Sequence, residues 1–228
     1  WSCEADGERA VFSAHFADGL DGFPGSLAVQ ITYSIENGSD LRIDYTAKSD
    51  QDTVANFTNH TYFNLSGAGS GPVYEQTLQL NADRFTPSDK ENIPTGELRT
   101  VENSCFDFRT KKTFGRDIGD TMLAHTHGFD HNFCLNGTGL RTVAHAYSPE
   151  TGIALAMETT QPGLQLYTGN WIAEGLAGKD GKQYGPHGAF CLEAQFYPDA
   201  VHHGNFQSPI LKAGDTARQT TIYRFSDR

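Results

Sequence analysis

The sequence lacks any long apolar run. No stretch approaches the roughly 20 residues that a helix needs to cross a bilayer, so we expect no membrane partner. Hydrophobic residues make up 37% of the chain and charged residues 20%, which is typical of a globular protein and not of a disordered one. With 228 residues, the chain is long enough to bury a substantial core.

Basic charge is also scarce. The chain has 17 Lys and Arg residues against 28 Asp and Glu residues, for a formal net charge of -11. Phosphate backbones repel a protein of this charge, so we expect no nucleic-acid partner.

Signatures of metal sites and disulfide frameworks are missing as well. A chain of this size does not need disulfide bonds, so free buried thiols are expected. Neither the histidines within residues 125–127 nor the pair His202–His203 has the i, i+4 spacing of a helical zinc site. The four cysteines, Cys3, Cys105, Cys134 and Cys191, show no CxxC spacing. We therefore predict no metal and no cofactor.

Helical periodicity is nearly absent, apart from one short turn near residues 114–118. Residues 27–35 and 41–45 instead alternate between apolar and polar, and Asn37-Gly38 between them fits a tight hairpin turn. Residues 143–147 and 153–157 predict a second hairpin, and residues 220–225 a final strand.

The 24 glycines and nine prolines divide the sequence into short segments of this kind. With no repeat, low-complexity tract or linker, the pattern predicts an all-β chain. We expect a single antiparallel β-sandwich domain over residues 1–228.

Glu193 is the first candidate for chemistry. In FCLEAQFYPDA (190–200), Phe190 and Leu192 alternate with Cys191, Glu193 and Gln195, so a strand would turn its carboxylate and amide to one face. The pattern alone equally fits a solvated strand face. The aromatic and apolar neighbours favour partial desolvation, which raises the basicity of a carboxylate.

His60 lies within NFTNHTYFNLSG (56–67), among amides and aromatic rings that suit a hydroxyl-rich ligand. A histidine in such a run is more often structural. Its ordinary pKa nevertheless makes it the natural side chain for donating and recovering a proton near neutrality.

Two further stretches carry polar residues on predicted strands. Asp130 and Asn132 alternate with aromatic residues in HTHGFDHNF (125–133), where Gly128 allows an unusual backbone entry. A turn or capping role for Asp130 is the plainer explanation. In TTQPGLQLYTGNW (159–171), aromatic rings accompany amides, a combination that holds sugars but also occurs in ordinary cores.

Taken together, these stretches resemble the aldose 1-epimerase family. The similarity covers nearly the whole chain and includes five sequence motifs. Any one of these motifs would be weak support, but five in the same order are strong support. The motifs are NHTYFNLSG, IPTGEL, GFDHNF, TTQPGLQLYTGN and CLEAQFYPDA.

The resemblance implies a large galactose mutarotase-like β-sandwich that interconverts the anomers of aldohexoses such as glucose and galactose. Glu193 matches the family's catalytic base and His60 its catalytic acid, while Asp130 matches the aspartate that binds sugar hydroxyls. Trp171 falls where the family usually has phenylalanine. We expect the substrate-binding set to be Asp130, Trp171, Gln195 and Asn59.

The sequence departs from the family pattern in one respect. Family members carry an N-terminal segment with an arginine in an NRI-like motif and a histidine in an LHGG-like motif, and neither motif occurs here. We therefore expect an N-terminally incomplete sandwich. The missing strands would leave unpaired edges and uncovered core, which a partner chain could cover. The expected partners are the sugar and either that segment as a separate chain or a second copy.

Three alternatives remain open. A non-catalytic sugar-binding or sensor protein of the same fold would keep the cleft without turnover. A glycoside hydrolase would use Asp130 and Glu193 as its carboxylate pair. A hexose-6-phosphate epimerase is less favoured, because no cluster of basic residues is evident. The compartment is also open, with the cytoplasm favoured over secretion.

Overall fold

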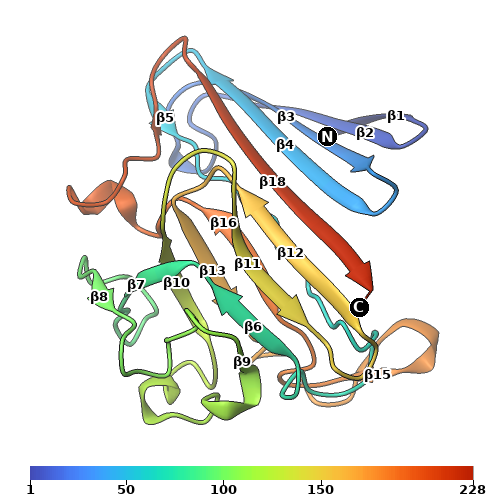
Figure 1. Cartoon of the computed structure of the whole chain (residues 1–228). Helices are drawn as coiled ribbons and strands as arrows, with labels where there is room; N and C mark the ends of the chain where they lie inside the picture. The colour runs from blue at the N-terminus through green and yellow to red at the C-terminus, as the bar shows by residue number, and fades with distance from the viewer. Residues whose placement is uncertain (228) are drawn as a thin grey trace.

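The computed structural model describes residues 1–227, and its architecture is nearly all β (Figure 1). Two antiparallel sheets of nine and five strands dominate it, joined by loops and short 3-10 turns. The predicted all-β, mutarotase-like sandwich class is confirmed. The single-domain assignment stays a prediction.

The nine-stranded sheet contains both chain ends described by the structure. Across the sheet its strands are β1 (Ser2–Asp6), β2 (Arg9–Phe16), β3 (Leu27–Glu36), β4 (Asp40–Ser49), β18 (Thr216–Asp227), β12 (Ile153–Thr159), β11 (Arg141–Tyr147), β6 (Thr77–Leu80) and β9 (Lys112–Thr113).

The five-stranded sheet lies against part of this larger sheet (Figure 1). Across it the strands are β16 (Cys191–Gln195), β13 (Gly163–Tyr167), β10 (Asp130–Leu135), β7 (Ala82–Thr86) and β8 (Arg99–Thr100). Two small pairs complete the strands: β5 (Thr53–Val54) with β17 (Ile210–Leu211), and β14 (Leu176–Ala177) with β15 (Gln183–Tyr184). The 3-10 turns are η1 (Leu20–Gly22), η2 (Phe114–Arg116), η3 (Thr121–Leu123), η4 (Lys179–Gly181) and η5 (Ala200–His202).

Both predicted hairpins are confirmed. Strands β3 and β4 pair from Leu27 opposite Ser49 to Glu36 opposite Asp40, and Asn37 and Gly38 have φ angles of 52° and 80° in the turn. The second hairpin is β11–β12, and the predicted final strand is the 12-residue β18, which pairs with β4 and β12. The short turn expected near residues 114–118 is η2.

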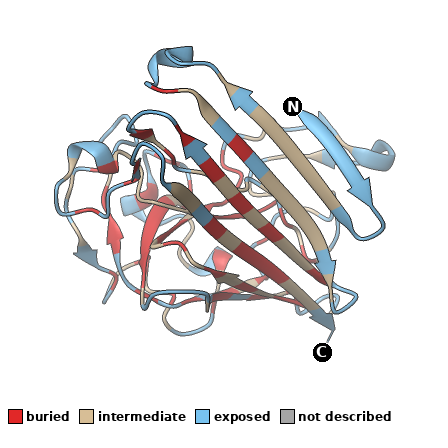
Figure 2. Ribbon diagram, turned by 90° about the horizontal axis from the view of Figure 1, so that it is seen from above, coloured by how far each residue is buried: buried red, intermediate tan, exposed pale blue. Residues whose placement is uncertain are grey.

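The core lies between the two sheets. Apolar side chains that point inward from the large sheet meet those of the small sheet in one cluster, for example Leu155 and Tyr223 with Phe133 and Leu164. Buried and half-buried residues alternate along the long strands, as period-2 geometry requires, whereas β1 is exposed along its whole length and β2 is mostly half-buried (Figure 2).

Two side chains of β18 link the sheets. The hydroxyl of Tyr223 donates to the Leu192 carbonyl at 2.9 Å, and the Gln219 amide donates to the Ala194 carbonyl at 3.1 Å. Strand β16 ends the small sheet and pairs with β13 on one edge, so these bonds satisfy carbonyls on its other edge. The large sheet thereby holds the strand that carries Glu193.

All four cysteines are free, and three are buried while Cys3 is exposed, so the expectation of buried thiols is wrong for Cys3, on the edge strand β1. Within residues 1–227, no helix is long and apolar enough to cross a membrane.

Candidate active site

Strands β10, β13 and β16 present a polar face built from residues in register. Asp130 lies opposite Tyr167, which lies opposite Cys191; in the next row on that face, Asn132, Gln165 and Glu193 are aligned in the same way. Successive residues of a strand alternate between faces, so the intervening Leu166 and Leu192 join the core behind. The sequence builds the site and its support from the same three strands.

Glu193 is a buried carboxylate, with 7% of its surface exposed. Burial, together with the nearby charge of Asp130, raises its pKa from 4.5 to about 7. Desolvation disfavours the charged form, as the sequence analysis expected for this position. A group with such a pKa can both accept and return a proton near neutral pH.

His60 approaches Glu193 from the loop that precedes Tyr62. Its Nε2 lies 3.4 Å from Oε1 of Glu193, and its ring stacks on Tyr62 with centroids 4.9 Å apart. Tyr167 meets the same imidazole edge-on at 5.9 Å. The contact with Glu193 is longer than a charge-assisted hydrogen bond, as apo sites often are. The half-exposed imidazole is thus aimed at the buried carboxylate.

Asp130 is held by Gln165. The Gln165 amide nitrogen donates to Oδ1 of Asp130 at 2.7 Å, while its own Oε1 is buried with no partner among residues 1–227. Burial raises the pKa of Asp130, and the hydrogen bond from Gln165 opposes that rise. An unpaired buried acceptor is costly, so Gln165 is ready to accept a hydrogen bond from a ligand hydroxyl.

The entry to β10 is fixed by a close backbone approach. Gly128 has a φ of 144°, and any side chain there would overlap those of Asn170 and Thr168. The Asn170 amide donates to the carbonyls of Thr126 and Phe129 at 2.8 and 3.0 Å. The segment before β10 and the segment after β13 therefore pack too closely for any residue but glycine at position 128.

The other residues predicted to bind substrate lie at different places. Trp171 is 60% exposed and packs edge-on against His127 at 4.7 Å, and its backbone amide donates to the Tyr167 hydroxyl at 3.1 Å. Gln195 is half-buried on β16, on the same face as Glu193. Asn59 instead donates to the Tyr33 hydroxyl of β3 at 3.2 Å, so its amide is partly engaged outside the polar face.

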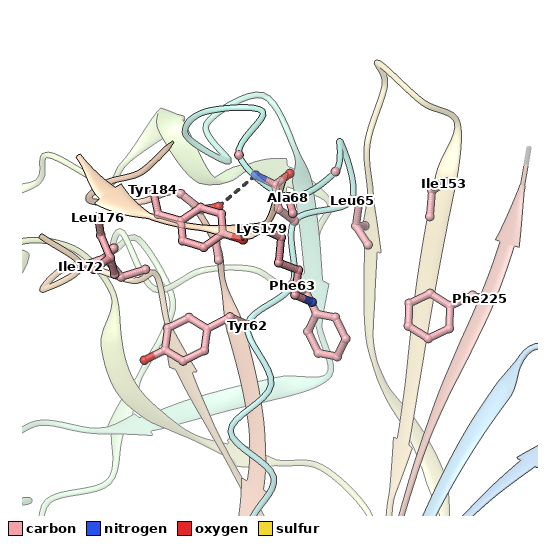
Figure 3. Close-up of a pocket in the computed structure, with 15 residues that line it drawn as sticks. Tyr62, Phe63, Leu65, Ala68, Ile153, Ile172, Leu176, Lys179, Tyr184 and Phe225 are labelled. Carbon is pink, nitrogen blue, oxygen red and sulfur yellow. Dashed lines mark hydrogen bonds between the residues drawn. The ribbon is translucent and has the colours of Figure 1, made fainter. Parts of the chain in front are cut away.

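A large cavity lies beside this site and not within it. It has a volume of about 680 Å³ and a mostly apolar lining that includes Phe63, Ile172 and Phe225, with Tyr62 at its border with the site (Figure 3). Neither Glu193 nor Asp130 lines it. The candidate catalytic residues therefore lie on the polar face and not at this cavity.

Tyr62 and Cys191, which adjoin the pair of Glu193 and His60, carry no individual role in the sequence analysis, whereas Gln165 is one of the amides of residues 159–171 considered there for holding a sugar. All three flank predicted site residues, but only the strand register and the path of the 56–62 loop bring them together. Cys191 joins His60 and Glu193 in a cluster whose potential ligand atoms all lie within 4.8 Å of one another. It is the one such group among the described residues.

Comparisons with known proteins identify relatives that match nearly the whole chain. The family model for aldose 1-epimerase matches residues 1–224. The galactose mutarotase of Bos taurus is 40% identical over 227 residues, which cover 99% of this chain and 65% of that protein. The aldose 1-epimerase of Haemophilus influenzae is 39% identical, and the match covers 99% of this chain and 67% of that one. The chain thus spans about two thirds of the length of these relatives.

Solved structures of aldose epimerases have a similar fold. An aldose epimerase homologue from C. elegans superposes with a TM-score of 0.88 at 30% identity, over 100% of this chain and 68% of that one. The galactose 1-epimerase of Lactobacillus acidophilus gives a TM-score of 0.84 at 28% identity, over 99% of this chain and 65% of that one.

Proposed function

The chain belongs to the aldose 1-epimerase family, and on that premise we propose that the protein interconverts the α and β anomers of aldohexoses such as glucose and galactose. Glu193 acts as the general base and His60 as the general acid. The observation that carries the proposal is their contact: a carboxylate with a pKa of about 7 lies 3.4 Å from an imidazole at an open polar face.

The proposed reaction needs two coupled proton transfers. Glu193 removes the proton from the C1 hydroxyl while His60 gives a proton to the ring oxygen, and the C1–O5 bond breaks to yield the aldehyde. Rotation about C1–C2 presents the other face of the carbonyl. Ring closure returns both protons, so the enzyme ends each turnover as it began.

The geometry suits this chemistry because both sugar oxygens are bonded to the same carbon. Two proton-transfer groups that serve them must therefore lie close together, as Glu193 and His60 do. Each such group contributes roughly 10²–10⁴-fold to the rate.

Binding groups for the sugar surround this pair. The carboxylate of Asp130 accepts hydrogen bonds from sugar hydroxyls, and the unpaired Oε1 of Gln165 accepts another. The exposed Trp171 ring offers a flat apolar surface to the CH groups of the pyranose. Gln195 and Asn59 are kept as further substrate-binding candidates.

Polarimetry on freshly dissolved α-D-glucose and α-D-galactose tests the proposal. The protein should accelerate the change in optical rotation, and Glu193→Gln should abolish most of the acceleration. Glu102→Gln, an exposed carboxylate in the loop after β8, is the matched control and should retain it.

Other outcomes separate the alternatives. No acceleration, with sugar binding still detected by calorimetry, would overturn the proposal and favour a non-catalytic sugar-binding protein. Full activity in Glu193→Gln would remove Glu193 from the role of base.

A further inference from the structure

Cys191 is a buried thiol that the proposed epimerase chemistry does not use. It precedes Glu193 by two residues on β16, so the two side chains point to the same face of the strand. Cys191 is fully buried, whereas the His60 side chain is 48% exposed. The cluster therefore has two fixed members on a strand and one adjustable member at the solvent boundary.

We propose that His60, Cys191 and Glu193 form a binding site for a thiophilic divalent cation such as zinc. Nitrogen, thiolate sulfur and carboxylate oxygen are the three donor types that zinc uses in proteins. Soft thiolate ligation disfavours magnesium and calcium, which prefer oxygen.

The distances fit this donor set after a small adjustment. Zinc bonds of about 2.0–2.3 Å place the ligand atoms of a tetrahedral centre roughly 3.3–3.8 Å apart. His60 Nε2 and Glu193 Oε1 are already 3.4 Å apart, and all three ligand atoms lie within 4.8 Å of one another. No pair of these atoms therefore exceeds tetrahedral spacing by more than about 1 Å.

Burial of the cluster opposes ionisation of its thiol, so a metal would have to displace that proton. Burial raises the pKa of the Cys191 thiol well above its usual value, and the charges of Glu193 and Asp130 raise it further. The phenols of Tyr62 and Tyr167 face the same carboxylates, and their pKa values are raised too, mainly by burial. Once the thiol proton is displaced, the charge of a divalent cation would offset those of the thiolate and of Glu193.

Protons must leave as the metal binds. The thiol gives up its proton, and so does any fraction of Glu193 that is protonated, so between about one and two protons enter solvent and affinity rises with pH. Three protein ligands leave one tetrahedral position open for water.

A bound cation would occupy both proposed proton-transfer groups. We therefore expect it to inhibit anomer exchange in competition with the sugar, a consequence that rests on the proposed function. The site itself does not depend on that function. This ion is an inhibitor and not a participant in the reaction, so the proposal conflicts with the prediction of no metal but not with that of no cofactor.

Cobalt(II) titration tests binding without an activity assay. In a Cys3→Ser background, which removes the exposed thiol, Co²⁺ should produce a sulfur-to-cobalt charge-transfer band in the near ultraviolet. Zn²⁺ should abolish the band, because it binds such sites more tightly than cobalt. The band should disappear in Cys191→Ala and persist in Cys134→Ala, a buried cysteine of β10 outside the cluster.

A second variant guards against misfolding of the buried-cysteine mutant. His60→Ala changes an exposed side chain, and it should weaken metal affinity by more than the roughly 10–100-fold that loss of an outer-shell contact costs. Absence of the band in the parent protein, or its persistence in Cys191→Ala, would overturn the proposal. So would unchanged affinity in His60→Ala.

Polarimetry then tests whether the bound metal inhibits anomer exchange. Zn²⁺ should slow anomer exchange by the parent protein, and a chelator should restore it, whereas Cys191→Ala should keep its basal rate and resist Zn²⁺. Equal inhibition of Cys191→Ala would overturn inhibition through this cluster. If no variant accelerates exchange at all, the epimerase proposal fails, while the cobalt spectrum still decides the metal site.

Discussion

Replacing Glu193 by glutamine should stabilise the fold while removing activity, because the site keeps a carboxylate where burial disfavours its charge. The pKa of Glu193 is about 7 in the folded protein against 4.5 for the ordinary group, so the folded state binds more protons between these values. Stability therefore falls as pH rises through this window and is constant above it.

The size of the effect follows from the shift. Each pKa unit corresponds to 1.36 kcal/mol, so a shift from 4.5 to about 7 costs the wild-type protein about 3 kcal/mol above neutrality. Glutamine has nearly the same shape and does not titrate. The two proteins should differ little near pH 4, and Glu193→Gln should be more stable by about 3 kcal/mol at pH 8.

Urea denaturation across this pH range measures the difference, with the free energy of unfolding extrapolated linearly to water. Other groups titrate in both proteins, so the difference isolates Glu193 and its coupling to Asp130. Glu102→Gln should show no such trend. A difference between wild type and Glu193→Gln that stays flat with pH, or that favours wild type at pH 8, would refute the reasoning.

Three further predictions follow from the same contacts. Catalytic efficiency of the wild type should fall about tenfold per pH unit below about 7, because protonation removes the base; a flat polarimetric profile from pH 5 to 7 would contradict this. Asp130→Ala should weaken sugar binding by about 1.5–3 kcal/mol, measured by calorimetry, and unchanged affinity would exclude the proposed hydroxyl contact. Tyr223→Phe should lower the free energy of unfolding by about 1–3 kcal/mol, because the buried Leu192 carbonyl loses its partner; unchanged stability would show that this link between the sheets is unimportant.

Much of the fold could be predicted from local pattern. The alternation in residues 27–45 and 143–157 and the Asn37-Gly38 turn specify hairpins that need no distant contact. Strand β1 carries no such signal, since it is exposed along its whole length and buries no apolar face.

The site could be predicted only in part. Motifs make Glu193, His60 and Asp130 the candidates, and the apolar neighbours of Glu193 predict the burial that the structure has. The roles of Gln165 and Cys191 depend on the register between strands, which a single sequence does not specify. Asn59 lies in a motif segment, yet its amide contacts Tyr33 of the other sheet, a pairing that no local pattern encodes.

The register of β16 is what the site depends on most. A shift of one residue would exchange Glu193 with Leu192, removing the proposed base from the polar face and burying it in the core. The ladder with β13 holds one edge of the strand, and Tyr223 and Gln219 from β18 hold carbonyls on the other. His60, by contrast, lies in a loop and half in solvent. Substitutions in β16 should therefore act on folding and catalysis together, whereas those around His60 should change the rate and leave stability nearly unaltered.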